Sequence, residues 1–338
     1  MALKLAVPFR TATAYRTQKE TIRVRLEHDG TVGCGEAVPA DTYGQSLESA
    51  ESALRRMSES LSLCRLDIEA LVFGLLAVFD DQRATVAAVD AALHDWTGRK
   101  LGISTLRWLG LDPAGAPLTS FTIGMDEPDA LADNVRAAGA YPILKIKVGS
   151  DCDEENLSII RRLAPDKIVR VDANTAWTAE AALVRLPMLA SFGVELLEQP
   201  VPREDIDGLR RLKEAAVLPI IADESCVRPS DIEVLAGCVD GINIKLSKCG
   251  GIHEALRMIR LARRFGMRVM LGCMIESSLG VAAAAQLAPL ADWIDLDGHL
   301  LLEDDPYTGL GGAAGRLRLG ASPGLGVEPR GGQGAAQE

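Results

Sequence analysis

Apolar, strand-like runs recur at a near-constant interval through the last two-thirds of the chain. The polar residues that end successive runs between Lys147 and Lys245 lie 22 to 26 positions apart, and a helix-length amphipathic stretch follows each run. Buried runs that alternate with helices at this interval predict a parallel sheet. Eight consecutive units predict a closed α/β barrel. The runs are TSFTIG, ILKIKVG, IVRVDAN, VELLEQP, LPIIADES, GINIKLSK, RVMLGCM and DWIDLDG.

The first third of the chain has a different pattern. The alternating segments ETIRVRLEHDG and TVGCGEA are joined at Asp29-Gly30, which predicts a β-hairpin. Two helices should follow. The first covers residues 46–61 with Ser46 as its N-cap, and the second covers residues 82–102 and ends on Lys and Gly. This part of the chain is therefore expected to form an α+β unit.

The Pro- and Gly-rich segment LDPAGAPL, residues 111–118, predicts a domain junction. We expect an α+β capping domain over residues 1–115 and the barrel over residues 116–301. The Gly-rich residues 302–330 should contribute to the cap. Residues 331–338 should be disordered.

Composition and charge narrow the classes of function. The chain has 338 residues, of which 48% are hydrophobic and 25% charged, as in a globular enzyme. Its formal net charge of −11 disfavours nucleic-acid binding, so a small molecule is the expected partner. No apolar run is long enough to span a membrane, and MALKLAVPFR lacks the apolar region of a signal peptide. The seven cysteines contain no C-x-x-C pair, which predicts free thiols in a reducing, cytoplasmic location. A homo-oligomer is compatible with the sequence.

Charged residues stand at the carboxyl ends of the predicted strands, where barrel enzymes place their chemistry. Asp172, Glu198 and Asp223 end three adjacent strands and should converge on one point. Such carboxylates repel one another unless a divalent cation lies between them. Oxygen ligands without His or Cys favour Mg²⁺, with Mn²⁺ as a substitute. The alternative is that these acids only form ion pairs with nearby lysines, but three acids at matched strand ends favour a metal.

Lysines flank this predicted site on two sides. Lys145 and Lys147 are two positions apart on one strand, so both should point into the barrel. Their mutual repulsion and a nearby cation should lower their pKa from about 10.4 toward about 7 to 8, which suits a general base. Lys245 should face them from across the barrel.

The motifs KIKVG, VDANTAW, LLEQP, IIADES and INIKLSKCGG occur in an order and spacing that resemble the enolase superfamily, in its branch with a lysine on each face of the site. The resemblance implies a modified TIM barrel, (β/α)₇β, with an N-terminal α+β capping domain. The branch that uses a histidine from strand seven does not fit, because RVMLGCMIESS contains none. His253 and His299 are therefore expected to be structural.

The resemblance also implies roles for individual residues. The three carboxylates would bind the metal, Lys147 and Lys245 would form the acid/base pair, and Lys145 would give electrostatic support. This superfamily is known to use a Lys or His base with Mg²⁺ to stabilise an enediolate. Lys248 is a weaker candidate for the base and should lie in a loop.

Two aspartates distinguish the expected reaction. Asp295 and Asp297 end the eighth strand and should point the same way, where they could bind a substrate ammonium. Their D-x-D motif and the preceding GCMIESSLG resemble dipeptide epimerases, which adds Met274 and Glu276 as substrate-binding candidates. We therefore predict proton transfer at the α-carbon of the C-terminal residue of an L-X-Xaa dipeptide.

Substrate preference should depend on the capping segments, around residues 13–17 and in AVPADTYGQ. The resemblance suggests Arg16 as a basic contact, although Ala14 could occupy that position instead. The acidic residues Glu303, Asp304 and Asp305 could favour a cationic side chain or could form a solvated loop.

Other functions stay open on the same fold. An o-succinylbenzoate synthase-like or cycloisomerase-like lyase, or an N-acylamino-acid racemase, would need the metal and lysines but no ammonium site. A non-catalytic binding scaffold is the more remote alternative, because it would not need the lysines.

Overall fold

The computed structural model describes residues 1–61, 67–215 and 217–332, so Cys64 and residues 333–338 lie outside the described part of the chain. Eight parallel strands pair in sequence order, and a bridge between Thr119 and Ile294 joins the first strand region to the last. This confirms the predicted barrel and its eight strands. The strands are β5 (Phe121–Ile123), β6 (Ile143–Lys147), β7 (Ile168–Asp172), β8 (Val194–Glu198), β9 (Ile220–Ala222), β10 (Gly241–Lys245), β11 (Arg268–Gly272) and β12 (Trp293–Asp295).

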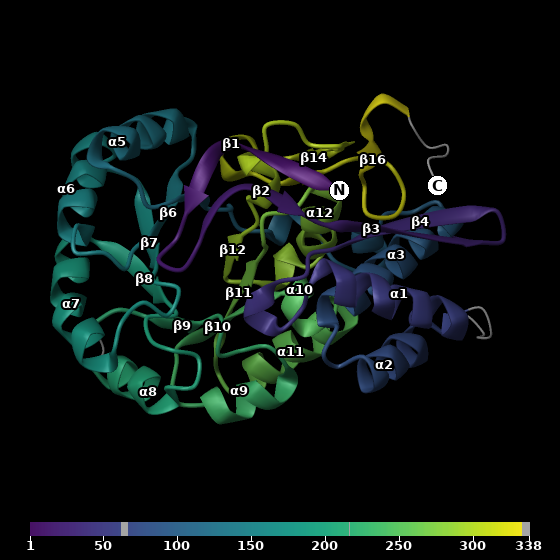
Figure 1. Cartoon of the computed structure of the whole chain (residues 1–338), viewed down its shortest axis with the longest axis horizontal. Coiled ribbons are helices and arrows are strands. Elements are labelled where there is room, and N and C mark those ends of the chain that lie inside the picture. Colours follow the sequence, from purple (N-terminus) through teal and green to yellow (C-terminus); the bar gives the residue numbers. More distant parts are fainter. Residues whose placement is uncertain (62–66, 216, 333–338) are drawn as a thin grey trace.

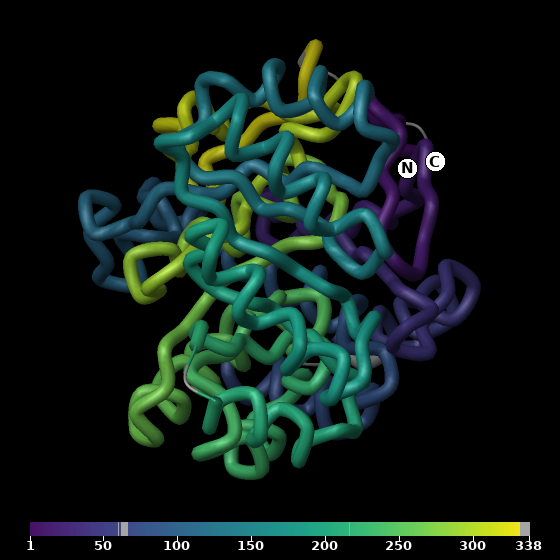
Figure 2. The backbone as a smooth tube through the Cα atoms, turned by 90° about the vertical axis from the view of Figure 1, so that its left-hand side faces the viewer, coloured from purple at the N-terminus to yellow at the C-terminus, as the bar shows by residue number. Residues whose placement is uncertain are grey.

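Helices surround the strands as a ring (Figure 1). A helix follows each of the first seven strands, whereas β12 is followed only by the 3-10 turn η5 (Gly298–Leu301), which gives the (β/α)₇β arrangement. In Figure 2 the teal helices of this ring face the viewer, and the purple N-terminal strands lie to the right. The ring contains α5 (Pro128–Ala137), α6 (Asp153–Leu163), α7 (Ala179–Ser191), α8 (Ile206–Glu214), α9 (Pro229–Leu235), α10 (Leu246–Cys249), α11 (Ile252–Arg264) and α12 (Ser278–Ala285).

Strand register sets the charged residues at one level of the barrel. Lys147 pairs with Asp172, and Asp172 pairs with Glu198. On the other side Lys245 lies beside Gly272. Because parallel strands all run the same way, these pairings place the carboxyl ends on one rim.

Antiparallel strands and three helices form the N-terminal part. β1 (Ala2–Arg10) pairs with β2 (Tyr15–Glu20), and β3 (Ile22–His28) pairs with β4 (Thr31–Ala37). Asp29 and Gly30 both have positive φ, at 49° and 68°, as the predicted tight hairpin requires. The helices are α1 (Leu47–Leu61), α2 (Ile68–Val78) and α3 (Arg83–Leu101), and the short α4 (Thr105–Trp108) follows.

Two features of these helices depend on packing. The pattern does not predict α2, since IEALVFGLLAV is apolar almost throughout and shows no helical period, yet it packs against α3 in an apolar cluster. Helix α3 lies directly on β4. A Cβ on Gly33 or Gly35 would come within 2.1 Å of the Ala92 carbonyl oxygen or 2.0 Å of the Ala88 carbonyl oxygen, so only glycine allows this approach.

The chain after the barrel returns to the N-terminal strands. Leu302 bridges to Leu5, and the Glu303 amide donates to the Lys4 carbonyl over 2.9 Å. Leu3, Leu5 and Leu302 form a buried apolar cluster. The segment contains β13 (Tyr307–Thr308), β14 (Leu310–Gly311), β15 (Arg318–Leu319) and β16 (Glu328–Pro329), and residues 331 and 332 belong to the turn η7 (Arg330–Gly332).

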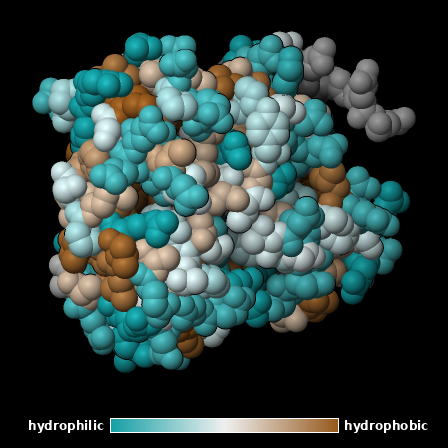
Figure 3. Space-filling model, turned by 60° about the vertical axis from the view of Figure 1, so that its left-hand side comes forward, coloured by the Kyte–Doolittle hydropathy of each residue, from teal (hydrophilic) through white to brown (hydrophobic). Residues whose placement is uncertain are grey.

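The surface matches the charged composition. The face in Figure 3 is mostly hydrophilic or neutral, with apolar residues in small groups. Within the described ranges, no helix has the length and hydrophobicity needed to cross a membrane.

Candidate active site

Three carboxylates from neighbouring strands meet at the carboxyl rim of the barrel. Asp172 and Glu198 end β7 and β8, and Asp223 directly follows β9. All three are buried, and one oxygen of each lies within 4.8 Å of the others. The structure thus brings together the three acids that the strand spacing singled out. An all-carboxylate donor set fits Mg²⁺ or Mn²⁺ and disfavours zinc.

The protonation of these acids reflects their crowding. Burial raises the pKa of Glu198 to about 7, and the charge of Asp172 adds to this effect. Burial acts on Asp172 in the same direction, but Lys147 and Lys145 outweigh it and lower its pKa to about 2. A bound divalent cation would relieve the repulsion between these carboxylates, which contributes to the raised pKa of Glu198.

Lysines approach these carboxylates from two sides. Lys147 Nζ lies 2.6 Å from Asp172 Oδ2, and Lys245 Nζ lies 2.7 Å from Asp223 Oδ2. Since β6 and β10 are four places apart in an eight-stranded barrel, the two amino groups come from opposite sides. Lys145 lies between the carboxylates, with its Nζ 2.8 Å from Glu198 Oε2.

The lowered pKa predicted for Lys145 presumes a bound cation, and among the carboxylates alone the pKa of Lys145 shifts in the other direction. Burial does lower its pKa, but Asp295, Glu198 and Asp172 raise it well above the usual value. The pKa of Lys245 is also raised well above the usual value, because Asp223 outweighs burial. The prediction considered repulsion between the two lysines and a nearby cation, but not the carboxylates that Lys145 contacts.

Lys248 does not lie in a loop, as the sequence suggested, but in the short helix α10. It is fully buried, and its Nζ contacts the carboxylate and carbonyl oxygens of Asp223. It is not part of the pocket wall. Lys245, by contrast, does line the pocket.

The pocket above the carboxylates has about 200 Å³ of free space and lies between the barrel rim and the N-terminal strands. The three lysines of the barrel rim and Asp223 line one side. Both capping segments that we expected to control substrate preference line the other side, including the turn η1 (Asp41–Tyr43). The capping residues in the wall are Phe9, Thr11, Thr13, Ala14, Arg16, Lys19, Ala40, Thr42 and Tyr43.

Asp295, the last residue of β12, and Asp297, two residues further on, both line this pocket and are both buried. Asp295 is held by Ser120, whose hydroxyl donates over 2.7 Å, and by Lys145, whose Nζ is 2.5 Å away. Asp297 Oδ2 accepts from the Thr122 amide over 2.5 Å. Burial raises the pKa of Asp297 to about 7, with a further contribution from Asp295.

The motif after β11 is only partly in the wall. Met274 and Ile275 line the pocket, whereas Glu276 lies behind them and accepts a hydrogen bond from the Met274 amide over 2.9 Å. Burial and the charge of Glu36 raise the pKa of Glu276 to about 8.

Sequence reasoning missed several wall residues. Lys19 lines the pocket near Arg16, and its Nζ donates to the Pro39 carbonyl over 2.6 Å. Burial, then the charge of Arg16, lowers the pKa of Lys19. Asn174 and Glu224 also line the pocket and are joined by a 3.2 Å hydrogen bond. Their positions beside Asp172 and Asp223 in VDANTAW and IIADES were the available signal, whereas no motif marked Lys19.

The acidic loop lies outside this pocket wall. Glu303 pairs with Lys4 over 2.7 Å, and Asp305 accepts hydrogen bonds from Ser278. These contacts connect the loop to other segments and do not point its charges at the site.

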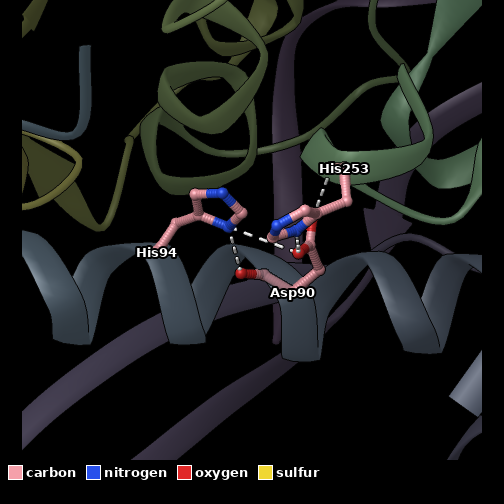
Figure 4. Close-up of side chains that lie close together, drawn as sticks. All are labelled: Asp90, His94 and His253. Carbon is pink, nitrogen blue, oxygen red and sulfur yellow. Dashed lines mark hydrogen bonds and ion pairs between the residues drawn. The ribbon is translucent and has the colours of Figure 1, made fainter. Parts of the chain in front are cut away.

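A second polar cluster joins α3 to α11 (Figure 4). Asp90 Oδ1 lies 2.7 Å from His253 Nδ1, and His94 Nδ1 lies 2.9 Å from the Asp90 carbonyl oxygen. The Nδ1 atom of each histidine faces an oxygen acceptor and therefore carries a proton. These two Nδ1 atoms have no lone pair for a metal. Asp90 also accepts from the backbone amides of Ile252 and His253 at the start of α11. His253 is therefore structural, as expected. His299 is also buried outside the pocket wall.

Comparisons with known proteins agree with this architecture. Residues 1–110 match the mandelate racemase / muconate lactonizing enzyme N-terminal domain, and residues 128–333 match the enolase C-terminal domain-like family. The L-Ala-D/L-Glu epimerase of Bacteroides thetaiotaomicron is 38% identical over 96% of this chain and 85% of its own length.

Two solved structures are similar over nearly their whole length. The dipeptide epimerase from Cytophaga hutchinsonii, complexed with Mg and D-Ala-L-Val, has a TM-score of 0.92 and 30% identity, covering 98% of this chain and 95% of that one. The dipeptide epimerase from Enterococcus faecalis V583, complexed with Mg and L-Leu-L-Tyr, has a TM-score of 0.91 and 34% identity, covering 97% of both chains. The barrel, its capping strands and these matches together show that the chain belongs to the enolase superfamily, in its mandelate racemase / muconate lactonizing enzyme family.

Proposed function

We propose that this chain is a magnesium-dependent dipeptide epimerase that inverts the α-carbon of the C-terminal residue of an L-X-Xaa dipeptide. The arrangement of charged side chains in the pocket is the main support for this function. Lys147 and Lys245 reach a buried three-carboxylate site from opposite sides, and an aspartate pair stands in the same pocket. The dipeptide epimerases among the relatives and similar structures support it.

Asp172, Glu198 and Asp223 would hold the metal. When bound, Mg²⁺ supplies a Lewis acid that stabilises negative charge on the substrate carboxylate. Of Lys147 and Lys245, the one whose amine is neutral takes the α-proton from one face, and the other, as an ammonium, gives a proton to the opposite face. Lys145 stays cationic among the carboxylates and adds positive charge where the enolate forms.

The aspartates and the capping wall would select the substrate. Asp297, with Asp295 beside it, binds the free ammonium of the dipeptide by charge-assisted hydrogen bonds. Lys19 and Arg16 place positive charge on the capping side of the pocket, which favours an acidic side chain. The acidic loop pairs with other segments, and this weakens the case for a cationic side chain.

The buried aspartate pair also separates the alternatives. A lyase, a cycloisomerase or an N-acylamino-acid racemase would gain nothing from two acids at the end of β12. A non-catalytic scaffold would not need buried lysines on both sides of the site, because burying charge is costly.

Incubation of a dipeptide library in D₂O with Mg²⁺ tests the proposal, with mass spectrometry and chiral analysis as the readouts. We expect deuterium at the α-carbon of the C-terminal residue, formation of both epimers, and no uptake in excess EDTA. N-acetylated dipeptides serve as the matched control and should exchange poorly. Uptake that ignores EDTA, or turnover of a cyclohexadiene or lactone faster than of any dipeptide, would overturn it.

A further inference from the structure

The carboxylate of Asp223 is held between two lysines that differ in their surroundings. Lys245 Nζ contacts Oδ2 over 2.7 Å, and Lys248 Nζ contacts Oδ1 over 2.5 Å. Lys245 lines the pocket, whereas Lys248 does not. The two oxygens of one carboxylate are thus divided between a lysine in the site and a lysine behind it.

Lys248 is saturated with acceptors. Beside the Asp223 carboxylate, its Nζ lies 2.5 Å from the Asp223 carbonyl oxygen and 3.0 Å from the carbonyl oxygens of both Cys226 and Asn243. An ammonium has three protons to donate, and here they meet four oxygen acceptors. The side chain is only 1% exposed. Its N–H groups are therefore all directed at protein oxygens, and the side chain does not reach the pocket.

The local fold explains how Lys248 reaches this position. Strand β10 ends at Lys245, and one helical turn, α10, follows directly. Gly250 closes that turn with a φ of 104°. The turn carries Lys248 back beneath the strand ends, where it ties the loop after β9 to the backbone of β10. Lys245 and Lys248 are only three residues apart, yet Lys245 faces the pocket and Lys248 faces away from it.

We infer that Lys248 is a positioning residue that fixes the Asp223 carboxylate with Oδ1 turned away and Oδ2 presented to the pocket, and so sets the affinity of the site for magnesium. The inference rests on the proposed function only in taking Asp223 as a metal ligand. Groups that orient a ligand typically change metal affinity by about 10- to 100-fold when they are removed. Loss of Lys248 would free the carboxylate to rotate and would leave its charge less compensated.

Calorimetric titration with Mg²⁺ in the absence of dipeptide tests this role. Lys248→Met removes the charge while it keeps most of the chain length, and we expect its Kd for Mg²⁺ to rise about 10- to 100-fold. Lys248→Arg restores the cation and should recover part of the affinity. Lys213→Met is the matched control, because Lys213 donates to a single backbone carbonyl, that of Val239, over 2.7 Å. Its Kd should equal that of the wild type.

Kinetics at increasing Mg²⁺ separate positioning from catalysis. A positioning role predicts that Lys248→Met regains most of its kcat at saturating Mg²⁺ and still exchanges the α-proton of both epimers. Unchanged Mg²⁺ affinity would overturn the inference, as would loss of exchange from one epimer at saturating metal. If Lys248→Met does not fold by circular dichroism, Lys248→Gln, which keeps hydrogen-bond donors, is held to the same criteria. Because the titration needs no dipeptide, failure of the proposed substrate would leave this result standing.

Discussion

Lys147 and Lys245 each contact a different member of the carboxylate cluster, Asp172 at 2.6 Å and Asp223 at 2.7 Å, from strands on opposite sides of the barrel. The two amino groups therefore approach the site from opposite sides. A substrate carbon between them can lose a proton on one side and gain one on the other.

Replacing either lysine should therefore remove proton transfer on one face of the substrate and leave it on the other. Lys147→Ala and Lys245→Ala should each abolish epimerisation, but each should retain α-proton exchange from one epimer, and the epimer should differ between the variants. Proton NMR in D₂O with each pure epimer measures this, and Lys213→Ala is the control for loss of a lysine elsewhere. If both variants epimerise normally, the lysines are structural.

Metal dependence follows from the three buried acids. Glu198→Gln removes one charged ligand and should weaken Mg²⁺ binding by at least about tenfold, with the fold intact by circular dichroism. Excess EDTA should abolish wild-type activity, and Mg²⁺ or Mn²⁺ should restore it. Full turnover of a chelated sample that contains no metal by elemental analysis would contradict the assignment.

Asp297 tests the ammonium site. A hydrogen bond to a charged group contributes about 1.5 to 3 kcal/mol, so Asp297→Asn should lower kcat/KM for dipeptides by roughly 10- to 100-fold. The affinity for Mg²⁺ should not change, because Asp297 lies outside the carboxylate cluster. Equal rates with free and N-acetylated substrates would contradict this role.

Lys19 tests the preference for an acidic side chain. Lys19→Met should lower kcat/KM for a dipeptide ending in Glu by roughly tenfold, since one charge-assisted contact is lost. A dipeptide ending in Leu should be almost unaffected, which makes it the internal control. Arg16→Met, measured in parallel, shows which of the two cations contributes more. An equal effect on both substrates would mean that Lys19 acts only through the capping fold.

The contact between α3 and α11 should respond to pH. Burial lowers the pKa of His253, but Asp90 outweighs it and raises the pKa. A raised pKa means that the stabilisation is fully present below the unfolded value of about 6.5 and is lost as pH rises through the folded value. The pKa of Asp90 is lowered, because the histidines outweigh its burial, so its contribution is lost only in strong acid.

His253→Gln should therefore lower Tm more at pH 5.5 than at pH 8.5. Thermal unfolding followed by circular dichroism at both pH values measures the difference. His28→Gln is a suitable control, because His28 is exposed at the end of β3. A penalty that is the same at both pH values would contradict an ion pair at this contact.

The sequence alone determined the barrel and the positions of its charged residues. A repeat of 22 to 26 residues marks one strand and one helix, and parallel strands place their carboxyl ends on one rim. Asp172, Glu198 and Asp223 could be grouped for this reason, without knowledge of any distance. The hairpin at Asp29-Gly30 was equally local, since positive φ at both positions is a property of those two residues.

Tertiary structure decided which atoms touch. Lys248 and Lys245 are three residues apart and chemically identical, yet one turn of helix separates a buried support from a lysine in the pocket. The raised pKa of Lys145 depends on carboxylates that approach from three other strands. Lys19 reaches the pocket only because the β1–β2 strands lie over the barrel. Such contacts join segments far apart in the chain, so periodicity and spacing, which report the backbone direction of one segment at a time, could not predict them.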